Sequence, residues 1–135
     1  MNIKIDTLVV NSQGDELEMS FPSEKIVRDL PKDDNGKPNR DMLPRETVQN
    51  MLLNCLATYQ SSDKKEIFSI FDLGQRLIKA KGEIEISDEE QDLLVKVVEK
   101  AIYKETTTKD GQKTSVGIYR LWGIAQLYKA LGVQP

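Results

Sequence analysis

The chain has 135 residues, a formal net charge of −3, one cysteine and no histidine. A length of this order fits one domain with its own hydrophobic core. Without histidine, the usual base of a catalytic triad and the usual ligand of a catalytic zinc are both missing, and one cysteine cannot build a structural zinc site. We therefore expect no enzyme: no catalytic residue, no metal site and no cofactor.

Composition and charge also bear on location. No apolar run approaches the roughly 20 residues that span a bilayer, and residues 1–6 lack the basic and apolar stretches of a signal peptide. The negative charge gives no general attraction to nucleic acid or to an anionic membrane. Cys55 lies in an apolar helical pattern, where a thiol is a small hydrophobe suited to a reducing compartment. These features predict a cytoplasmic protein without membrane contact.

The N-terminal residues have the pattern of a β-hairpin. Ile3 and Ile5 alternate with polar residues, apolar and polar residues alternate again over 17–21, and residues 11–15 are turn formers. The pattern predicts a hairpin over residues 2–21 that packs on helices. Its open edge could pair with a strand of a partner protein or of a second copy.

Residues 32–42 form a polar loop around the turn signal Asp34-Asn35-Gly36. We expect the loop to divide a single domain into a β-rich part, residues 1–31, and a helical part, residues 43–135. Its mixed charge suits contact with a protein partner, although a plain loop is equally consistent. The candidate contact residues in it are Asp33, Asp34, Lys37 and Arg40.

Helical periodicity predicts helices over residues 44–59 and 65–81. The second of these has an unusually wide apolar face, which we expect to be buried. Its members are Ile67, Phe68, Ile70, Phe71, Leu73, Leu77 and Ile78. Cys55, in the first helix, is expected to pack in the core, because no histidine is present to activate it.

A short strand is predicted at residues 83–86, where glutamate and isoleucine alternate. A third helix follows from Ser87, which with Glu90 forms a capping box. The acidic residues over 83–92 have the composition of a cation site, but the capped helix start explains them without one. A last helix is predicted over 116–131, and residues 104–115 form either a loop or a hairpin.

Basic residues offer an alternative interaction surface. Lys96, Lys100 and Lys104 are spaced four apart, which predicts one stripe on the third helix. Together with Lys113 they could bind nucleic-acid phosphates, as a helix followed by a wing does. A solvated face whose lysines pair with nearby acids explains the same spacing.

The closing helix carries the candidate aromatic contacts. We expect Trp122 to lie in the core, while Tyr119 fits either the core or a partner-binding surface.

Two segments carry a family resemblance. The run from Leu73 to Val98 contains a helix, the Glu-Ile-Glu-Ile strand and the Ser-Asp-Glu-Glu helix start, and Tyr119 to Leu127 forms a closing helix. Over about half of the chain, residues 73–128, this pattern resembles small phage and prophage accessory proteins. The resemblance implies a phage accessory or assembly origin and assigns no functional residue.

The sequence therefore predicts an α+β fold, with an N-terminal β-hairpin packed on a bundle of three or four helices. The predicted function is a non-enzymatic protein-binding module, such as a phage-encoded factor that engages a host or virion protein. The alternative is a nucleic-acid-binding protein that uses the lysines. A hydrolase that uses only carboxylates ranks last, because nothing in the sequence places two carboxylates across a recognisable cleft.

Overall fold

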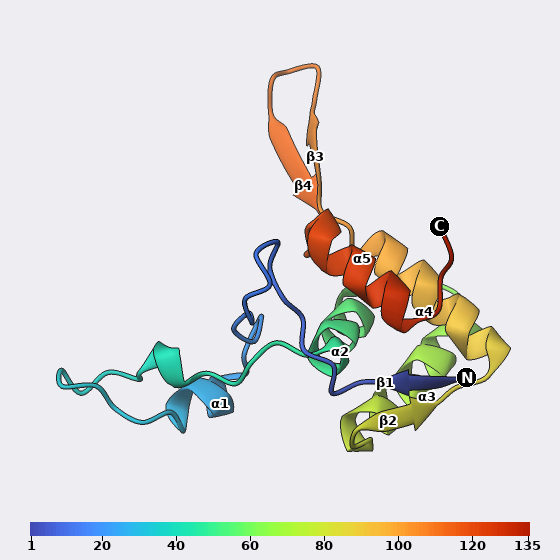
Figure 1. Cartoon of the computed structure of the whole chain (residues 1–135). Coiled ribbons are helices and arrows are strands. Elements are labelled where there is room, and N and C mark those ends of the chain that lie inside the picture. The colour runs from blue at the N-terminus through green and yellow to red at the C-terminus, as the bar shows by residue number, and fades with distance from the viewer.

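The structure, a computed structural model, describes residues 1–135 and has an α+β fold, as predicted (Figure 1). The elements in chain order are β1 (Asn2–Lys4), α1 (Glu24–Arg28), the 3₁₀ turn η1 (Arg40–Met42), α2 (Val48–Thr58), α3 (Lys64–Lys79), β2 (Glu83–Glu85), α4 (Asp88–Lys100), β3 (Lys104–Thr107), β4 (Lys113–Val116) and α5 (Leu121–Ala130).

The N-terminal strand finds its partner far along the chain. β1 pairs antiparallel with β2, so that Ile3 lies opposite Ile84, and both side chains are buried on the same side of the sheet. Beyond these strands, the backbones of Met1 and Ile86 exchange two further hydrogen bonds. The predicted strand at 83–86 is thus confirmed, and it supplies the edge that β1 needs.

The predicted hairpin over residues 2–21 is wrong in its pairing. A single bridge from Val10 to Glu16 closes the turn, after which the Leu17 carbonyl accepts from the Glu46 N–H and the Met19 N–H donates to the Pro44 carbonyl. β1 pairs with β2 instead, because this pairing buries Ile3 against the helices. The hairpin edge proposed for pairing with a second copy is therefore not formed.

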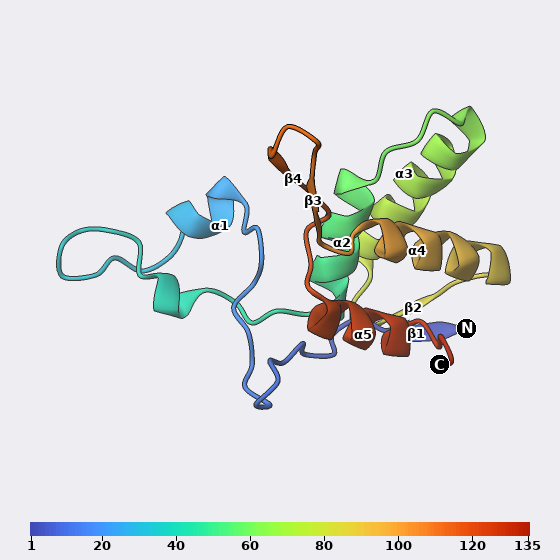
Figure 2. The same ribbon diagram turned by 90° about the horizontal axis from the view of Figure 1, so that it is seen from above.

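The core is built around α2, which packs against α3, α4 and α5 (Figure 2). Twenty buried residues form one cluster, from Ile3 at the N-terminus to Leu131 after α5. Cys55 lies within it, 1% exposed, as expected, and burial raises the pKa of its thiol to about 12.

Two helices begin later than their periodicity predicts. α2 starts at Val48 because the residues from 44 to 46 are extended and bonded to the 17–19 segment, and Thr47 caps the helix. α5 starts at Leu121 because Ile118 and Tyr119 donate their backbone N–H groups to the carbonyl of Ala101.

Two segments project from the helical body. One is the β3–β4 hairpin, so residues 104–115 form a hairpin rather than a loop. The other is an arm, residues 21–43, which carries α1 and η1 away from the helices in both views (Figure 1, Figure 2). Its buried residues Leu30 and Leu43 are not members of the core cluster.

Candidate functional site: an exposed apolar face on α3

The most unusual surface of the molecule lies on α3. The helix begins at a well-formed cap, where the Asp63 carboxylate accepts the backbone N–H groups of Lys65 and Glu66. Of its seven large apolar residues, only Leu73 and Leu77 are fully buried. The expectation of one wide buried face is therefore wrong for the other side of the helix.

Four large apolar side chains of α3 face solvent. They are Ile67 at 47% exposure, Phe68 at 63%, Phe71 at 61% and Ile78 at 66%. At 3.6 residues per turn, Ile67, Phe71 and Ile78 fall within roughly 40° of one another, and Phe68 lies about 60° further round. We call these four residues the α3 face.

The extent of this surface is comparable to that of functional patches. Since a phenylalanine buries about 150–250 Å² when covered, the α3 face exposes on the order of 400 Å² of apolar surface. The largest apolar patch of a typical monomer is about 300–600 Å² and is often functional, whereas scattered single residues need no explanation. The four residues of the α3 face lie along one helix, and together they have the extent of a functional patch.

One ion pair fixes the N-terminal half of α3 against α4. The Lys96 ammonium donates to the Glu66 carboxylate at 2.9 Å, and the Tyr59 hydroxyl donates to the same carboxylate at 2.8 Å. These two hydrogen bonds, with that from Lys96 the stronger, lower the pKa of Glu66 to about 2. Glu66 and Lys96 therefore stay charged over the physiological range.

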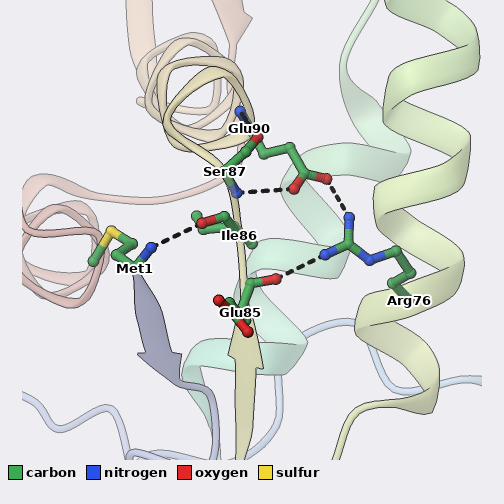
Figure 3. Close-up of polar contacts among 6 residues, drawn as sticks. All are labelled: Met1, Arg76, Glu85, Ile86, Ser87 and Glu90. Atoms are coloured by element: carbon green, nitrogen blue, oxygen red, sulfur yellow. Dashed lines mark hydrogen bonds and ion pairs between the residues drawn. The ribbon is translucent and has the colours of Figure 1, made fainter.

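A second polar cluster fixes the C-terminal half (Figure 3). The Arg76 guanidinium pairs with the Glu90 carboxylate and donates to the carbonyl of Glu85 at 2.7 Å. Glu90 in turn completes the predicted capping box with Ser87, which the structure confirms. Arg76 thus joins α3 to β2 and to the start of α4, so the α3 face is presented by a helix held at both ends.

The predicted contact residues of the loop lie on the arm. Asp33, Asp34, Lys37 and Arg40 are exposed, and the Asp33 carboxylate accepts the N–H groups of Asn35 and Lys37, both at 2.9 Å. Asp33 therefore has a structural task in closing the turn. The arm carries all four away from the α3 face, since the arm and α3 lie on opposite sides of α2 in both views (Figure 1, Figure 2).

Tyr119 is buried rather than displayed. It is 8% exposed, and its hydroxyl bonds to the Ser20 hydroxyl at 2.6 Å and to the Asn54 amide at 3.0 Å. Burial raises the pKa of Tyr119 to about 12. The same network includes Glu46, 2% exposed, which accepts from Asn50 and from the Ser20 N–H. Of the two roles considered for Tyr119, the structure places it in the core.

Trp122, expected in the core, is 55% exposed, and its indole N–H donates to the carbonyl of Val10. This bond holds the start of α5 against the N-terminal segment. Because α5 begins at Leu121, Trp122 lies in the first turn and outside the stripe that Ile124 and Leu127 bury.

The four candidate lysines do not form one surface. α4 ends at Lys100, so Lys104 lies in β3 and the predicted stripe on a single helix is wrong. Lys96 is bonded to Glu66, and Lys100 lines a hollow of about 480 Å³ beside Cys55. Lys104 and Lys113 lie on opposite faces of the hairpin, because Lys113 pairs with Thr107, an odd number of residues from Lys104.

Helical periodicity did not predict the α3 face, because apolar residues at helical spacing were all expected to be buried. One signal in the sequence could have found it: the apolar residues of α3 cover more of the helix circumference than one neighbouring layer can bury. A helix that is apolar over so wide an arc needs a second partner. The sequence alone did not tell which side the chain itself would cover.

Comparisons with protein-family models, with curated proteins and with solved structures found no match for this chain. The resemblance to phage accessory proteins therefore stays a prediction. No helix has both the length and the apolar character needed to cross a membrane. No group of three or more acidic, cysteine or histidine side chains is placed to hold a metal ion.

Proposed function

We propose that the chain is a non-enzymatic protein-binding module and that the α3 face is its contact surface. The observation that carries the proposal is the exposure of Ile67, Phe68, Phe71 and Ile78 along one helix. Covering this surface removes apolar area from water, at about 25 cal/mol per Å². Residues 1–135 themselves leave the face open.

The shape of the surface favours a protein over a small ligand. Small molecules bind in concave sites that enclose most of their surface, whereas these side chains stand on the outside of a helix. Aromatic residues are enriched and charged residues depleted at the centre of protein interfaces. Phe68 and Phe71 have the character of such a centre, with Lys64 and Lys79 near the ends of the helix.

A phage accessory role and a cytoplasmic location are compatible with this function and remain predictions. The hairpin edge is no longer a candidate contact, because its strands are paired elsewhere.

The arm is a second candidate contact: it exposes five residues of each charge sign over residues 24–41 and lies apart from the core.

The test is a matched pair of variants. Phe71→Glu places a charge in the centre of the α3 face, and Leu121→Glu places one at a residue of α5 that is 69% exposed. We expect Phe71→Glu to lose the wild-type protein contacts in a pull-down and Leu121→Glu to keep them, with unchanged circular dichroism for both. Equal recovery with Phe71→Glu and wild type would contradict the proposal.

A further inference from the structure

We infer that the occupant of the α3 face is a second copy of this chain, bound so that two α3 helices lie antiparallel about a two-fold axis between residues 72 and 73. The inference rests on the proposed function, because it names the partner of the same surface. Two-fold dimers are the commonest protein assemblies, and each surface in them must be complementary to itself.

The spacing along α3 meets that condition. Ile67, Phe71, Gly74 and Ile78 follow one another in steps of four, three and four, which read the same in both directions. In the antiparallel pair, Ile67 therefore lies opposite Ile78 of the second copy, and Phe71 lies opposite its Gly74. Steps of three and four keep all four positions on one side of the helix.

Gly74 supports the same arrangement independently. It lies inside α3, where glycine costs about 1 kcal/mol relative to alanine. Nothing within the chain requires it: its φ is not positive, and an added Cβ would meet only the Leu56 Cδ1 atom, at 4.0 Å, which is ordinary contact. A ring from a second copy packed on this position explains the glycine, because the absence of a Cβ lets the aromatic side chain approach the helix closely.

The area agrees with a dimer of ordinary size. A standard interface buries about 800 Å² per partner, of which about 57% is apolar. The α3 face supplies apolar surface on the order of 400 Å², which is close to that share. Interfaces of this area range from micromolar to picomolar affinity according to their electrostatic complementarity, and like charges meet at both ends of this one, so we expect a dissociation constant of roughly micromolar order.

The charges at the ends of α3 predict a direction of salt dependence that separates a second copy from other occupants. The antiparallel arrangement brings Lys64 and Lys65 towards Lys79 and Lys81 of the second copy. Two acidic residues lie at the same end, but the Asp63 carboxylate caps the helix and Glu66 is bonded to Lys96. Added salt screens this repulsion, so the dimer should tighten several-fold between about 50 and 500 mM salt. Binding of an acidic amphipathic helix to the same face would weaken instead.

The experiment is sedimentation equilibrium of the full chain from about 1 to 200 μM, at low and high salt. We expect a monomer–dimer equilibrium that Phe71→Glu abolishes and Leu121→Glu retains. Gly74→Ala should weaken association about tenfold or more while raising the thermal stability measured at low concentration, where the chain is monomeric. If Gly74 served only the fold of the monomer, Gly74→Ala would not weaken association while raising thermal stability.

Orientation is tested with two single-cysteine positions. A mixture of Ile67→Cys and Ile78→Cys chains should give a mixed disulfide, whereas Ile67→Cys alone should not link to itself. In the antiparallel pair, two copies of residue 67 lie about 16 Å apart along the helix, beyond disulfide reach. Cys55 does not interfere, because it is 1% exposed.

A chain that remains monomeric at 200 μM overturns the inference, as does a dimer that Phe71→Glu leaves intact. The failure of the dimer is distinguishable from failure of the proposed function. If the chain is monomeric and a different protein is lost only with Phe71→Glu, the face binds proteins but its partner is not a second copy. If neither contact depends on Phe71, both proposals fall.

Discussion

Gly117 is the residue whose backbone the fold constrains most strongly. It lies at the base of the β3–β4 hairpin with φ of +83°, and an added Cβ would lie 2.1 Å from the carbonyl oxygen of Ile102. That oxygen belongs to backbone and cannot move aside. The return of the chain from the hairpin to α5 therefore depends on glycine at this position.

We expect Gly117→Ala to lower the free energy of unfolding by about 2–4 kcal/mol, because the left-handed backbone and the close contact both penalise a side chain. Urea denaturation measures the loss. Gly36→Ala is the matched control: its φ is +77°, but nothing lies within 4 Å of the added Cβ. It should cost only about 1 kcal/mol. Equal losses would mean that the contact with Ile102 does not matter.

The hydroxyl of Tyr119 bonds to Ser20 and Asn54 in a partly buried polar network, in which these two side chains also bond to each other. Tyr119→Phe leaves these groups short of a partner, and we expect a loss of about 1–2 kcal/mol in the free energy of unfolding. Tyr103→Phe is the control, since its bond to Glu105 is exposed and should matter little. A Tyr119→Phe chain as stable as wild type would show that water replaces the lost bonds.

At the scale of elements, the sequence predicted best what local signals determine. The capping box of Ser87 and Glu90 placed the start of α4 correctly, and the alternation at 83–86 identified β2. The partner of β1 could not be predicted in the same way, because its pairing with β2 depends on the burial of Ile3 and Ile84, which are distant in the chain. Likewise, no local signal showed which side of α3 would stay open.

The attachment of α3 to α4 makes a pH-dependent contribution. The pKa of Glu66 is lowered from 4.5 to about 2 by its bond to Lys96 and then by that to Tyr59. A group whose pKa is depressed on folding stabilises the fold above its unfolded pKa and loses that effect as pH falls. The stabilisation from Glu66 is thus complete above about pH 5 and is lost between 4.5 and 2.

We therefore expect Glu66→Gln to destabilise the chain at pH 7 and to differ progressively less from wild type as the pH falls from 4.5 towards 2. Denaturation at a series of pH values measures the difference. Glu24→Gln, on the arm and outside the three ion pairs of the structure, is the matched control. A constant difference between Glu66→Gln and wild type across this range would contradict the bonding seen for Glu66.

At the scale of the whole molecule, the arm is an addition to the fold rather than a part of its core. Its buried residues Leu30 and Leu43 lie outside the core cluster, and its two ends meet, since the Met19 N–H donates to the carbonyl of Pro44 at 2.9 Å. A polar loop was predictable from residues 32–42. The length of the excursion was not, because the apolar residues over 21–31 favour a core element, yet none of them belongs to the core cluster.

We expect replacement of residues 22–42 by a short Gly-Ser link to leave the rest of the chain folded, with the free energy of unfolding changed by no more than about 1 kcal/mol. Loop closure costs little when the ends already touch. Ser20 and Phe21 are retained so that the hydrogen bond and the edge-to-face ring contact with Tyr119 both persist. Loss of cooperative unfolding would contradict the separation of arm and core.

The central claim is that a second copy of the chain covers the α3 face, and the methyl NMR spectrum of the isoleucines tests it most directly. Spectra would be recorded while the chain is diluted from about 500 to 5 μM. The account predicts that the signals of Ile67 and Ile78 shift with concentration, while those of Ile26 on the arm and Ile118 before α5 do not. Signals of Ile67 and Ile78 that stay fixed, or that move no more than those of Ile26, would contradict it.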